Sequence, residues 1–391
     1  MKILEFGNIP SWAGGRQENG LSNVIYQLSV YLSKIDNADV TLAATDFFSI
    51  EEKRDNLLIL GWTKKILCRY IIAHPLLSVK IFMASLQSYL RYSPMVSLFN
   101  LFFKSVFLKY AIDRINPDIV HLHSTTALLY AYLVPKDCRL FITMHGLDGN
   151  NTEKKNYIVL NKMEDEICHL NNVSGIIFVT NRLISEFRDL YGSIKSPSYA
   201  ILNAYDSTSF YRISPSKHNK LSICTIASIS ENKGQMRVLE GIKLSGLDIA
   251  YTCIGNDAQG MSAGLINYAN TNNIDFKYLG TKTPAQIREI LAGSDFMILP
   301  SSSEGFGLVF LESIACGIPV MLPRDLPIVK EQNIITAENS VLLDDCSSES
   351  IAAALLTLKP DMFRGEDVSK SVSGCSWENV ADQYIKVFTQ S

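Results

Sequence analysis

Residues 300–320 read PSSSEGFGLVFLESIACGIPV, and this stretch indicates how the second half of the chain folds. The overlapping run DFMILPS (295–301) has the short, β-rich composition of a buried strand, whereas GLVFLESIACG (307–317) has helical spacing and is followed by a proline. Glu304 is therefore expected in a strand-to-helix loop, and Glu312 within the first turns of the helix. Loop glycines let backbone amides approach a ligand, and a helix N-terminus favours an anion such as a diphosphate.

The same alternation of a short apolar run and a longer helical stretch recurs along the chain. The runs are 2–8, 39–45, 118–124, 140–146, 175–181 and 199–205 in the first half, and 221–228, 249–255, 275–280, 295–301 and 319–323 in the second. Alternating strands and helices predict parallel sheets covered on both faces, with ligands at the carboxyl ends of the strands. The polar segment 206–220 separates the two series, so we expect two doubly wound α/β domains facing a ligand cleft.

Length and composition agree with this organisation. At 391 residues the chain exceeds what one hydrophobic core usually organises, and its net charge of −3 gives no basic field that would favour nucleic acid as a partner. The eight cysteines occur singly, without metal-ligand spacing, which is typical of reduced thiols in a cytosolic protein. Because we find neither a secretory signal nor a membrane-spanning run, we expect a cytoplasmic protein.

One region departs from the alternation. Residues 56–112 contain no acidic residue, and seven basic residues alternate there with aromatic and aliphatic ones: Lys64, Lys65, Arg69, Lys80, Arg91, Lys104 and Lys109. One interpretation is a set of core-packed helices with basic outer faces. The other, compatible with the first, is a patch that lies on an anionic membrane surface, such as the inner face of the cell membrane.

Residues 304–320 resemble the E-x7-E motif of the retaining GT-B glycosyltransferases of family 4, also called glycosyltransferase group 1. The resemblance implies that Glu304 binds hydroxyls of a donor sugar and that Glu312 binds the ribose hydroxyls of its nucleotide. It also implies that the loop lines the sugar and diphosphate, through Gly305, Phe306, Gly307 and Leu308.

The segment ISENKG (229–234) resembles the family's donor-phosphate loop, in which an arginine and a lysine hold the diphosphate. Lys233 matches the lysine, but Ser228 stands at the arginine position. Lysine is a point charge, whereas arginine offers a planar pair of donors, so this departure weakens the expected phosphate site. The cations that we consider as replacements are Arg16, Arg237 and Arg324.

Landmarks of the family also occur in the first half. The helix after ENG (18–20) resembles the N-terminal glycine loop, so Gly20 is expected near the donor phosphates or the acceptor, and FITMHG (141–146) resembles the segment whose histidine, here His145, faces the donor sugar. Without the resemblance, His145 reads as a buried structural histidine. Further positions expected near the acceptor or the cleft are Gly14, Gly15, Arg16, His121, His123 and Asn203, although both histidines fit the core equally well.

The C-terminal stretch CSWENVADQYIKVF (375–388) resembles the family's helix that crosses back onto the first domain. We therefore expect an α/β protein of GT-B architecture. Residues 1–208, completed by the helix 376–391, are predicted to form an acceptor-side Rossmann-like domain. Residues 209–375 are predicted to form the domain that binds the nucleotide sugar.

The resemblance implies a retaining hexosyltransferase that moves a sugar from a nucleotide-diphosphate donor to a hydroxyl of a glycan. With the basic region 56–112, a lipid-linked polysaccharide or oligosaccharide precursor is the expected acceptor. His145, Glu304 and Lys233 are the expected catalytic residues. No D-x-D metal site is evident, so we expect neither a metal nor a cofactor. Alternatives are a non-catalytic nucleotide-sugar-binding subunit, suggested by Ser228, and a GT-B epimerase or phosphorylase.

Overall fold

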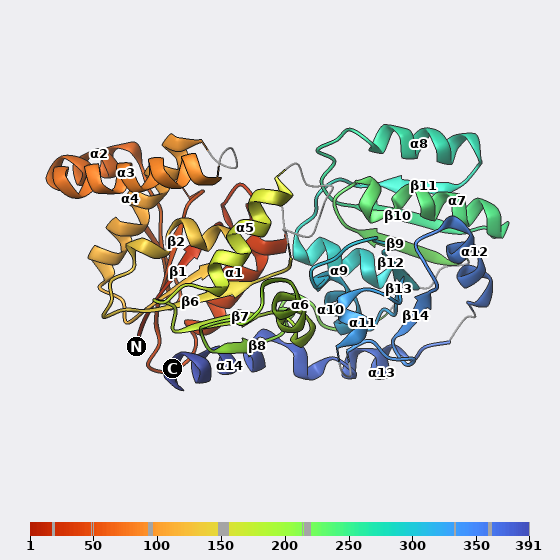
Figure 1. The fold of residues 1–391 in the computed structure, drawn as a ribbon. Coiled ribbons are helices and arrows are strands. Elements are labelled where there is room, and N and C mark those ends of the chain that lie inside the picture. Colours follow the sequence, from red (N-terminus) through yellow and green to blue (C-terminus); the bar gives the residue numbers. More distant parts are fainter. Residues whose placement is uncertain are drawn as a thin grey trace. The chain divides into compact units, whose positions relative to one another are not determined.

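The computed structural model describes residues 1–17, 20–47, 49, 51–92, 97–147, 156–212, 214, 220–331, 334–358 and 362–390. The chain forms two compact units (Figure 1). Unit 1 consists of Met1–Leu202 and Glu378–Ser391, and unit 2 of Asn203–Trp377. Whether unit 1 takes the acceptor and unit 2 the donor stays a prediction at this level.

Unit 1 is built on a sheet whose strand order is β3-β4-β2-β1-β5-β6-β7-β8. The strands are β1 (Lys2–Gly7), β2 (Asp39–Ala44), β3 (Glu51–Arg54), β4 (Leu57–Leu60), β5 (Ile119–His123), β6 (Arg139–Met144), β7 (Gly175–Phe178) and β8 (Ser198–Ala200). All pairings are parallel except that of β3 with β4. The apolar-run pattern missed two strands, the apolar β4 and the charged β3. The sequence of β3, EEKR, lies at the sheet edge, where charge discourages further strand pairing.

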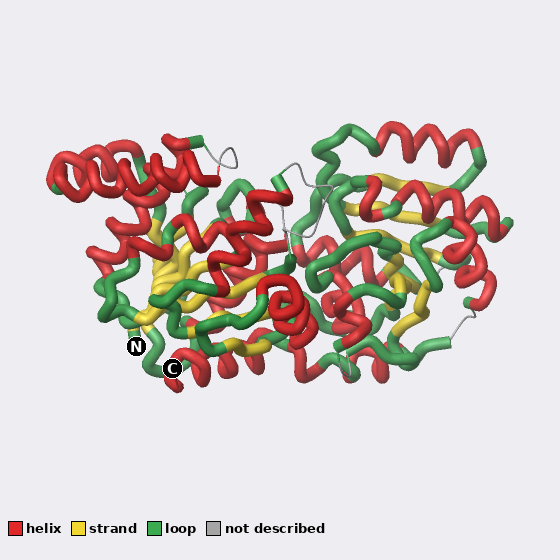
Figure 2. The backbone as a smooth tube through the Cα atoms, viewed as in Figure 1, coloured by secondary structure: helices red, strands yellow, loops and turns green. Residues whose placement is uncertain are grey.

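Helices accompany this sheet, and Figure 2 distinguishes them from the strands. They are α1 (Gly20–Leu32), α2 (Lys64–Ala73), α3 (Pro75–Tyr92), α4 (Leu98–Ile115), α5 (Tyr157–Cys168), α6 (Asn181–Tyr191) and α14 (Trp377–Gln390), with short 3-10 helices at Ser11–Ala13, Thr125–Leu129 and Ala131–Leu133. The apolar residues of β1 and β5 are buried, so the core of unit 1 lies around the central strands.

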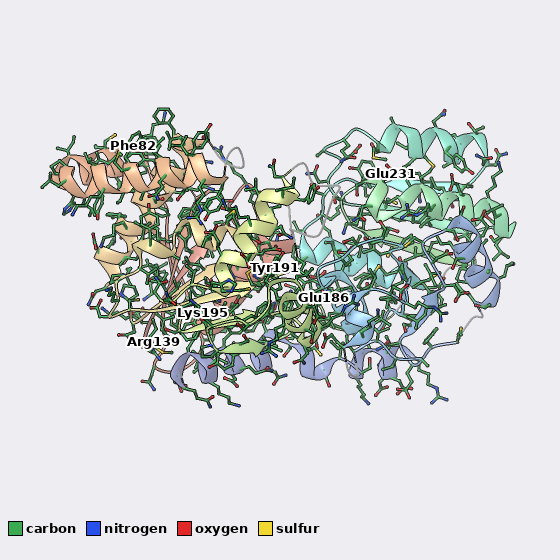
Figure 3. The ribbon with its side chains drawn as sticks, in the orientation of Figure 1. Phe82, Arg139, Glu186, Tyr191, Lys195 and Glu231 are labelled. Carbon is green, nitrogen blue, oxygen red and sulfur yellow. The ribbon has the colours of Figure 1, made fainter. Side chains whose placement is uncertain are left out.

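The C-terminal helix α14 returns to the sheet of unit 1. The ring of Phe388 lies 4.8 Å from that of Phe141 on β6, and the ring of Tyr384 lies 5.7 Å from that of His121 on β5. Arg139, which Figure 3 labels, donates a hydrogen bond to the Phe388 carbonyl (Figure 3). The predicted return of this helix to the first half of the chain is confirmed.

Unit 2 contains an all-parallel sheet of order β11-β10-β9-β12-β13-β14. The strands are β9 (Ser222–Ile226), β10 (Ala250–Ile254), β11 (Asp275–Tyr278), β12 (Phe296–Ile298), β13 (Val320–Pro323) and β14 (Ser340–Leu343). The helices are α7 (Gln235–Ser245), α8 (Ser262–Thr271), α9 (Pro284–Ala292), α10 (Leu308–Ala315), α11 (Pro327–Lys330), α12 (Ser348–Thr357) and α13 (Gly365–Lys370), with 3-10 helices at Glu231–Lys233 and Ser373–Cys375.

Each sheet contains one point where the chain reverses its direction of strand addition. In unit 1, β1 lies between β2 and β5, and in unit 2, β9 lies between β10 and β12. The loops that follow β1 and β5, or β9 and β12, therefore diverge and leave a crevice at the carboxyl ends of these strands. Both sets of candidate residues described below lie at these two points.

The polar segment 206–220 was expected to separate the two domains, but its beginning packs within unit 2. The Asp206 carboxylate is buried and accepts hydrogen bonds from the hydroxyls of Thr208 and Ser209 at 2.7 and 2.6 Å. Phe210 is also buried. A capped turn anchored by an aromatic ring is thus part of unit 2, while residues 213 and 215–219 lie outside the described residues.

Within the described ranges, no single helix has the length and apolar character needed to cross a membrane. By the same measure, α2 and α3 pass only when taken together, and they are bent by 112° at the break between them.

Candidate functional site

In unit 2, Lys233 and Glu304 bridge the loops that follow two neighbouring strands. Lys233 follows β9, Glu304 follows β12, and the lysine Nζ donates to the Glu304 Oε1 at 2.5 Å. Their side chains are 19% and 12% exposed. The pair places one positive and one negative group at the carboxyl ends of the strands, where a ligand reaches both.

Gly307 opens α10 beside this pair. Its φ of +86° lies in the left-handed region, and a Cβ would come within 2.6 Å of the Phe310 ring. A glycine is therefore required for the chain to enter the helix here. The Phe310 amide donates to the carbonyl of Gly307 at 3.0 Å, and the amides of Leu308 and Val309, which precede it, lie at the N-terminus of α10, where partial positive charge gathers.

Glu312 lies on the second turn of the same helix and is partly buried. Burial and, to a smaller extent, the nearby negative charge of Asp206 together raise the pKa of its carboxyl to about 7. No hydrogen bond to this carboxylate is present within the described part of the chain. The arrangement suits a carboxylate that receives hydrogen bonds from a ligand, such as the hydroxyls of a ribose.

The structure also shows the surroundings of Ser228, which stands where the family has an arginine, and of the arginines considered as its replacement. Ser228 is exposed, and its carbonyl accepts from the Gln235 amide at 3.0 Å. Arg237 donates to the carbonyls of Glu231, Asn232 and Pro300, so it joins the Lys233 loop to the end of β12 rather than pointing freely at a ligand. Arg324 is exposed and pairs with Asp344.

In unit 1, a buried chain of hydrogen bonds connects three strands. Glu5 on β1 accepts from His121 Nδ1 and His123 Nε2, each at 2.9 Å, and His121 Nε2 lies 2.7 Å from the Thr143 hydroxyl. His123 Nδ1 lies 3.2 Å from His145 Nε2. Sequence reasoning named the three histidines and missed Glu5, for which the available signal was a lone carboxylate within an otherwise apolar strand.

Burial and mutual contacts set the protonation of this group. Burial would raise the pKa of Glu5, but the attraction of His121 and hydrogen bonds from both histidines bring it down to about 2. Burial and the neighbouring His121 lower the pKa of His123 to about 4, and burial lowers that of His145 well below its usual value. His121 is fully buried with both ring nitrogens engaged, so its position does not support direct contact with an acceptor.

Glu5, His121 and His123 are also the candidate metal ligands in unit 1, because their ligand atoms all lie within 4.8 Å of one another. The same atoms bond one another directly, so an ion here would replace two hydrogen bonds of the buried network. The absence of a metal in the working protein stays a prediction.

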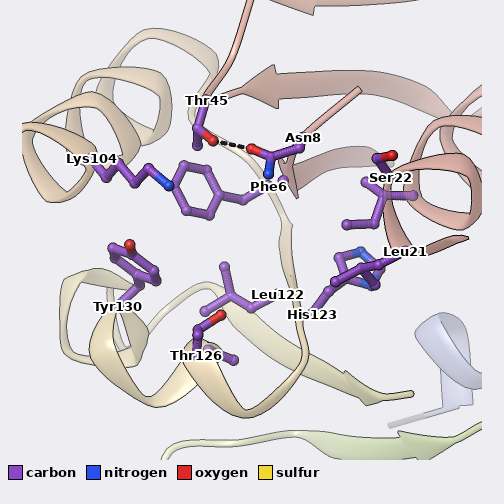
Figure 4. A pocket seen from close by; sticks show the side chains of 13 residues that line it. Phe6, Asn8, Leu21, Ser22, Thr45, Lys104, Leu122, His123, Thr126 and Tyr130 are labelled. Carbon is purple, nitrogen blue, oxygen red and sulfur yellow. Dashed lines mark hydrogen bonds between the residues drawn. The ribbon is translucent and has the colours of Figure 1, made fainter. Parts of the chain in front are cut away.

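A pocket of about 110 Å³ opens at the reversal point of unit 1 (Figure 4). Its polar lining includes Asn8, Ser22, Thr45, Lys104, His123 and Thr126, and Phe6 and Tyr130 are among its apolar and aromatic walls. Burial lowers the pKa of the Lys104 ammonium, while the charge of Asp46 acts in the opposite direction. The pocket therefore offers hydroxyl-binding groups beside one cation. Lys104 was noted in the sequence only as part of the basic region.

The remaining predicted positions differ in their local packing, exposure and hydrogen bonds. A Cβ at Gly15 would lie 2.0 Å from the Ile9 carbonyl oxygen, so this glycine is needed by the turn itself, whereas a Cβ at Gly20 would meet nothing within 4 Å. The Arg16 backbone amide donates to Asp46 at 3.0 Å, while its side chain is exposed. Asn203 is buried, and its Oδ1 has no hydrogen-bond partner within the described residues.

Sequence comparisons now place the chain in a family. The model of the family described as Glycosyltransferase Family 4 matches residues 18–209, and the model described as Glycosyl transferases group 1 matches residues 206–367. Together they cover both units except for the two ends of the chain. The chain belongs to the glycosyltransferases that these two models describe, family 4, also called group 1.

A curated relative and two solved structures are similar to it. N-acetyl-alpha-D-glucosaminyl L-malate synthase of Bacillus anthracis is 24% identical over 224 residues, which span 54% of this chain and 58% of that relative. Sucrose-phosphate synthase of Thermosynechococcus elongatus superposes with a TM-score of 0.77 at 14% identity, over 100% of this chain and 99% of that one. HepE of Anabaena, in complex with UDP and glucose, gives 0.72 at 16% identity over 100% of each chain. These likenesses establish the GT-B fold.

Proposed function

We propose that this protein is a glycosyltransferase that moves a sugar from a nucleotide-diphosphate donor to a hydroxyl of an acceptor, with retention at the anomeric carbon. The observation that carries the proposal is the group at the reversal point of unit 2. One lysine and a helix N-terminus there match a diphosphate, and Glu304 and Glu312 match the hydroxyls of the sugar and the ribose. HepE supports this choice, because its structure contains UDP and glucose.

In the proposed reaction, the bond between the anomeric carbon and the diphosphate oxygen breaks, and the acceptor oxygen bonds to that carbon on the same face. The acceptor proton passes to the leaving phosphate. Negative charge grows on that phosphate, so donors fixed in advance around it stabilise the transition state. Lys233 and the amides at Gly307 and Leu308 supply such donors without a metal ion.

The Lys233–Glu304 ion pair has to open for this to occur. A diphosphate offers Lys233 a stronger partner, and sugar hydroxyls give Glu304 donors in its place. Donor binding would thus exchange one ion pair for two sets of charge-assisted hydrogen bonds. The pair keeps both side chains ordered before the donor arrives, which lowers the entropic cost of binding.

The first experiment measures thermal stabilisation by a panel of UDP-, GDP- and ADP-sugars. A ligand at 100 times its Kd raises the unfolding free energy by about 2.7 kcal/mol, so a matching donor is identified by its shift in Tm. Release of nucleoside diphosphate is then followed in the presence of candidate acceptors. We expect Glu304→Ala to abolish release and Glu289→Gln, an exposed glutamate on α9, to preserve it. Turnover that survives in Glu304→Ala would contradict the proposal.

A second candidate is a non-catalytic subunit that binds a nucleotide sugar. It is favoured by Ser228 at the arginine position and by the engagement of Arg237 with backbone carbonyls. The same assays separate the two candidates. Thermal stabilisation by a donor without release of nucleoside diphosphate, for every acceptor class tried, would favour the subunit.

For the acceptor we propose a lipid-linked glycan precursor, recognised by unit 1 through the pocket beside His123. The support is an apolar face of α3 that is exposed in the part of the chain that the structure describes. Leu76, Val79, Met83 and Leu90 recur at helical spacing, and their side chains are 57–81% exposed. The opposite face, which includes Ser78, Ile81, Ser85 and Tyr92, is buried.

Basic residues lie on α3 and on α2, the helix that precedes it. Lys64, Lys65 and Arg69 on α2 and Lys80 and Arg91 on α3 are all exposed. We propose that the lysines and Arg69, together with the apolar face of α3, bind anionic lipids, each nearby cation contributing about 1 kcal/mol. Arg91 pairs with Glu166 at 2.7 Å. Phe82, which Figure 3 labels, lies on α3 and packs edge-on against Phe102 of α4 at 5.5 Å, joining this surface to the body of unit 1.

Flotation with vesicles tests the membrane part. We expect binding to vesicles that contain anionic phosphatidylglycerol, weaker binding to phosphatidylcholine alone, and loss of binding when Leu76, Val79 and Met83 are replaced by serine. Leu244→Ser with Leu356→Ser, two exposed apolar residues of unit 2, is the matched control. Efficient transfer to a soluble acceptor without vesicle binding would contradict this part. The name of the B. anthracis relative refers to malate and not to a lipid.

A further inference from the structure

The three basic residues of α4 differ in their partners. Lys109 pairs with Asp113 one turn along the helix, and Arg114 pairs with Glu51 of β3. Lys104 forms neither an ion pair nor a hydrogen bond within the described residues. Its side chain instead lines the pocket at the reversal point of unit 1, and Figure 4 shows it extending from α4 toward that pocket. A lysine that lines a pocket without a partner is a cation available to a ligand.

One carboxylate, that of Asp46, acts on Lys104 from nearby, but its oxygens are engaged elsewhere. This carboxylate is buried, and it accepts hydrogen bonds from the backbone amides of Ile9 and Arg16, each at 3.0 Å. None of the described residues that line the pocket is an aspartate or a glutamate. Burying a cation without a bonded anion costs free energy, and a bound anion recovers part of that cost.

Uncharged hydrogen-bond donors line the same pocket as Lys104. The hydroxyls of Thr126 and Tyr130 have no hydrogen-bond partner within the described part of the chain. Burial raises the pKa of the Tyr130 phenol, so the phenol keeps its proton and can donate it to a ligand. The Asn8 carboxamide accepts from the Thr45 hydroxyl through its oxygen, which leaves its N–H groups for a ligand (Figure 4).

The size and the chemistry of the pocket together define the class of ligand. Its volume of about 110 Å³ is below the roughly 300–1,000 Å³ of sites that enclose a whole small molecule, so it takes one group of a larger ligand. An ammonium, two hydroxyls and a carboxamide all donate hydrogen bonds to that group. A phosphate offers three acceptor oxygens around one atom and can receive donors from several sides, whereas a carboxylate offers two oxygens in one plane.

We infer that this pocket is a phosphate site, in which Lys104 binds a phosphate group of the acceptor together with Thr126 and Tyr130. The inference rests on the proposed function in one respect, namely that the phosphate belongs to an acceptor. Two sources share this chemistry: the diphosphate of a lipid-linked precursor and the phosphate of a soluble sugar phosphate. Lys104 follows Phe102 on α4 by two residues, and Phe102 packs against Phe82 of α3, so the lipid-linked source agrees with the membrane surface proposed above.

Binding of inorganic phosphate to the full-length protein, without donor or acceptor, tests the site. Lys233→Met serves as the background, because it removes the cation proposed for the donor diphosphate in unit 2. Titrations followed by 31P NMR measure the binding that remains. We expect Lys104→Met, added to this background, to weaken phosphate binding by about 10- to 100-fold, since the lost hydrogen bonds are charge-assisted.

Lys109→Met is the matched control, because it makes the same change on the same helix at a lysine that has its own partner. It should bind phosphate like the background. The inference is overturned if the background binds no phosphate, if Lys104→Met binds it as well as the background does, or if Lys109→Met loses as much affinity as Lys104→Met.

Two further variants remove hydroxyls and keep the charge of Lys104, so they test the site even if Lys104→Met does not fold. Tyr130→Phe and Thr126→Val are each expected to weaken phosphate binding by about 2- to 10-fold, which is the net effect of one neutral hydrogen bond. Unchanged phosphate affinity in both variants would overturn the inference.

Competition with bound inorganic phosphate distinguishes the two sources. Tighter binding of farnesyl diphosphate than of glucose 6-phosphate assigns the site to a lipid-linked acceptor, and the reverse order assigns it to a soluble sugar phosphate. Either order supports a phosphate site, whereas acetate that displaces phosphate more effectively than both would overturn it.

Sugar transfer provides a separate readout. In the otherwise wild-type protein, Lys104→Met should raise the KM for a phosphorylated acceptor and leave the KM for the donor unchanged. An unchanged acceptor KM would overturn the assignment of the phosphate to the acceptor. A protein that binds phosphate through Lys104 but transfers no sugar would contradict the proposed function and leave the phosphate site in place, so the two failures are distinguishable.

Discussion

Lys233 and Glu304 lie 71 residues apart in the chain, and their side chains form an ion pair across the ends of two adjacent parallel strands. The donor site proposed for unit 2 depends on this relationship. It places the cation proposed for the diphosphate and the anion proposed for the sugar within one hydrogen bond of each other.

Replacing Lys233 with methionine is expected to weaken binding of the nucleoside diphosphate by about 10- to 100-fold, because a charge-assisted hydrogen bond contributes about 1.5–3 kcal/mol. Calorimetric titration measures the loss. Lys277→Met, an exposed lysine on β11, serves as the control and should bind like the wild type. Equal affinity in Lys233→Met would remove this lysine from the phosphate site.

Glu312→Gln is expected to stabilise the ligand-free protein at pH 8 and to leave it unchanged near pH 4. The folded pKa of about 7 lies above the unfolded value of 4.5, so stability is full below about 4.5 and is lost as pH rises through 7. The amide carries no charge and avoids this loss. Thermal unfolding across this pH range provides the measurement, and a stabilisation that does not depend on pH would contradict the assignment.

The same carboxyl group predicts how donor binding depends on pH. Ribose hydroxyls donate to the ionised form, so binding should release a proton near neutrality and become tighter between pH 6 and pH 8. Titrations in buffers of different ionisation enthalpy count the protons. In Glu312→Gln we expect weaker binding and no such release, and a wild-type proton count that persists in the variant would assign it to another group.

Gly307→Ala is expected to destabilise the protein by about 1–2 kcal/mol, because an L-residue is strained at a φ of +86° and its Cβ would meet the Phe310 ring. Gly264→Ala in α8, where a Cβ meets nothing within 4 Å, should instead stabilise by about 0.5–1 kcal/mol. Chemical denaturation compares the two. Gly20→Ala should leave stability nearly unchanged, so a loss of ligand binding in that variant would identify Gly20 as a contact.

Acid should destabilise unit 1 in two steps. The folded pKa of His123, about 4, lies below its unfolded value, so the unfolded chain takes up the proton first and stability falls from about pH 6.5 to pH 4. Glu5, with a folded pKa of about 2, adds a loss from about pH 4.5 downwards. His123→Phe should reduce the loss of stability between pH 6.5 and pH 4. His169 is an exposed histidine, and His169→Asn should leave that loss unchanged. A first step of equal size in His123→Phe would assign it elsewhere.

Metal analysis of the purified protein tests the remaining expectation at Glu5, His121 and His123. We expect no bound metal in stoichiometric amount and full activity in the presence of EDTA. A stoichiometric ion that disappears in His121→Phe would show that the three residues are ligands rather than hydrogen-bond partners.

Much of the local secondary structure of this protein could be predicted from the sequence. The E-x7-E spacing around Gly307 predicted a strand, a loop and a helix, because loop glycines and helical periodicity act over a few residues. Alternating strands and helices predicted the two parallel sheets for the same reason. The charged edge strand β3 and the packed turn at Asp206 escaped prediction, since polar composition alone resembles a loop.

Only the tertiary structure decided which distant side chains share a site. Glu5 and His121 are 116 residues apart, and their contact depends on β1 and β5 being neighbours in the sheet. Arg237 read as a spare cation until its guanidinium was found bound to three carbonyls. Periodicity and motif spacing report on neighbours along the chain, whereas strand order and register determine the pairing, burial and protonation of groups that the chain brings together from far apart.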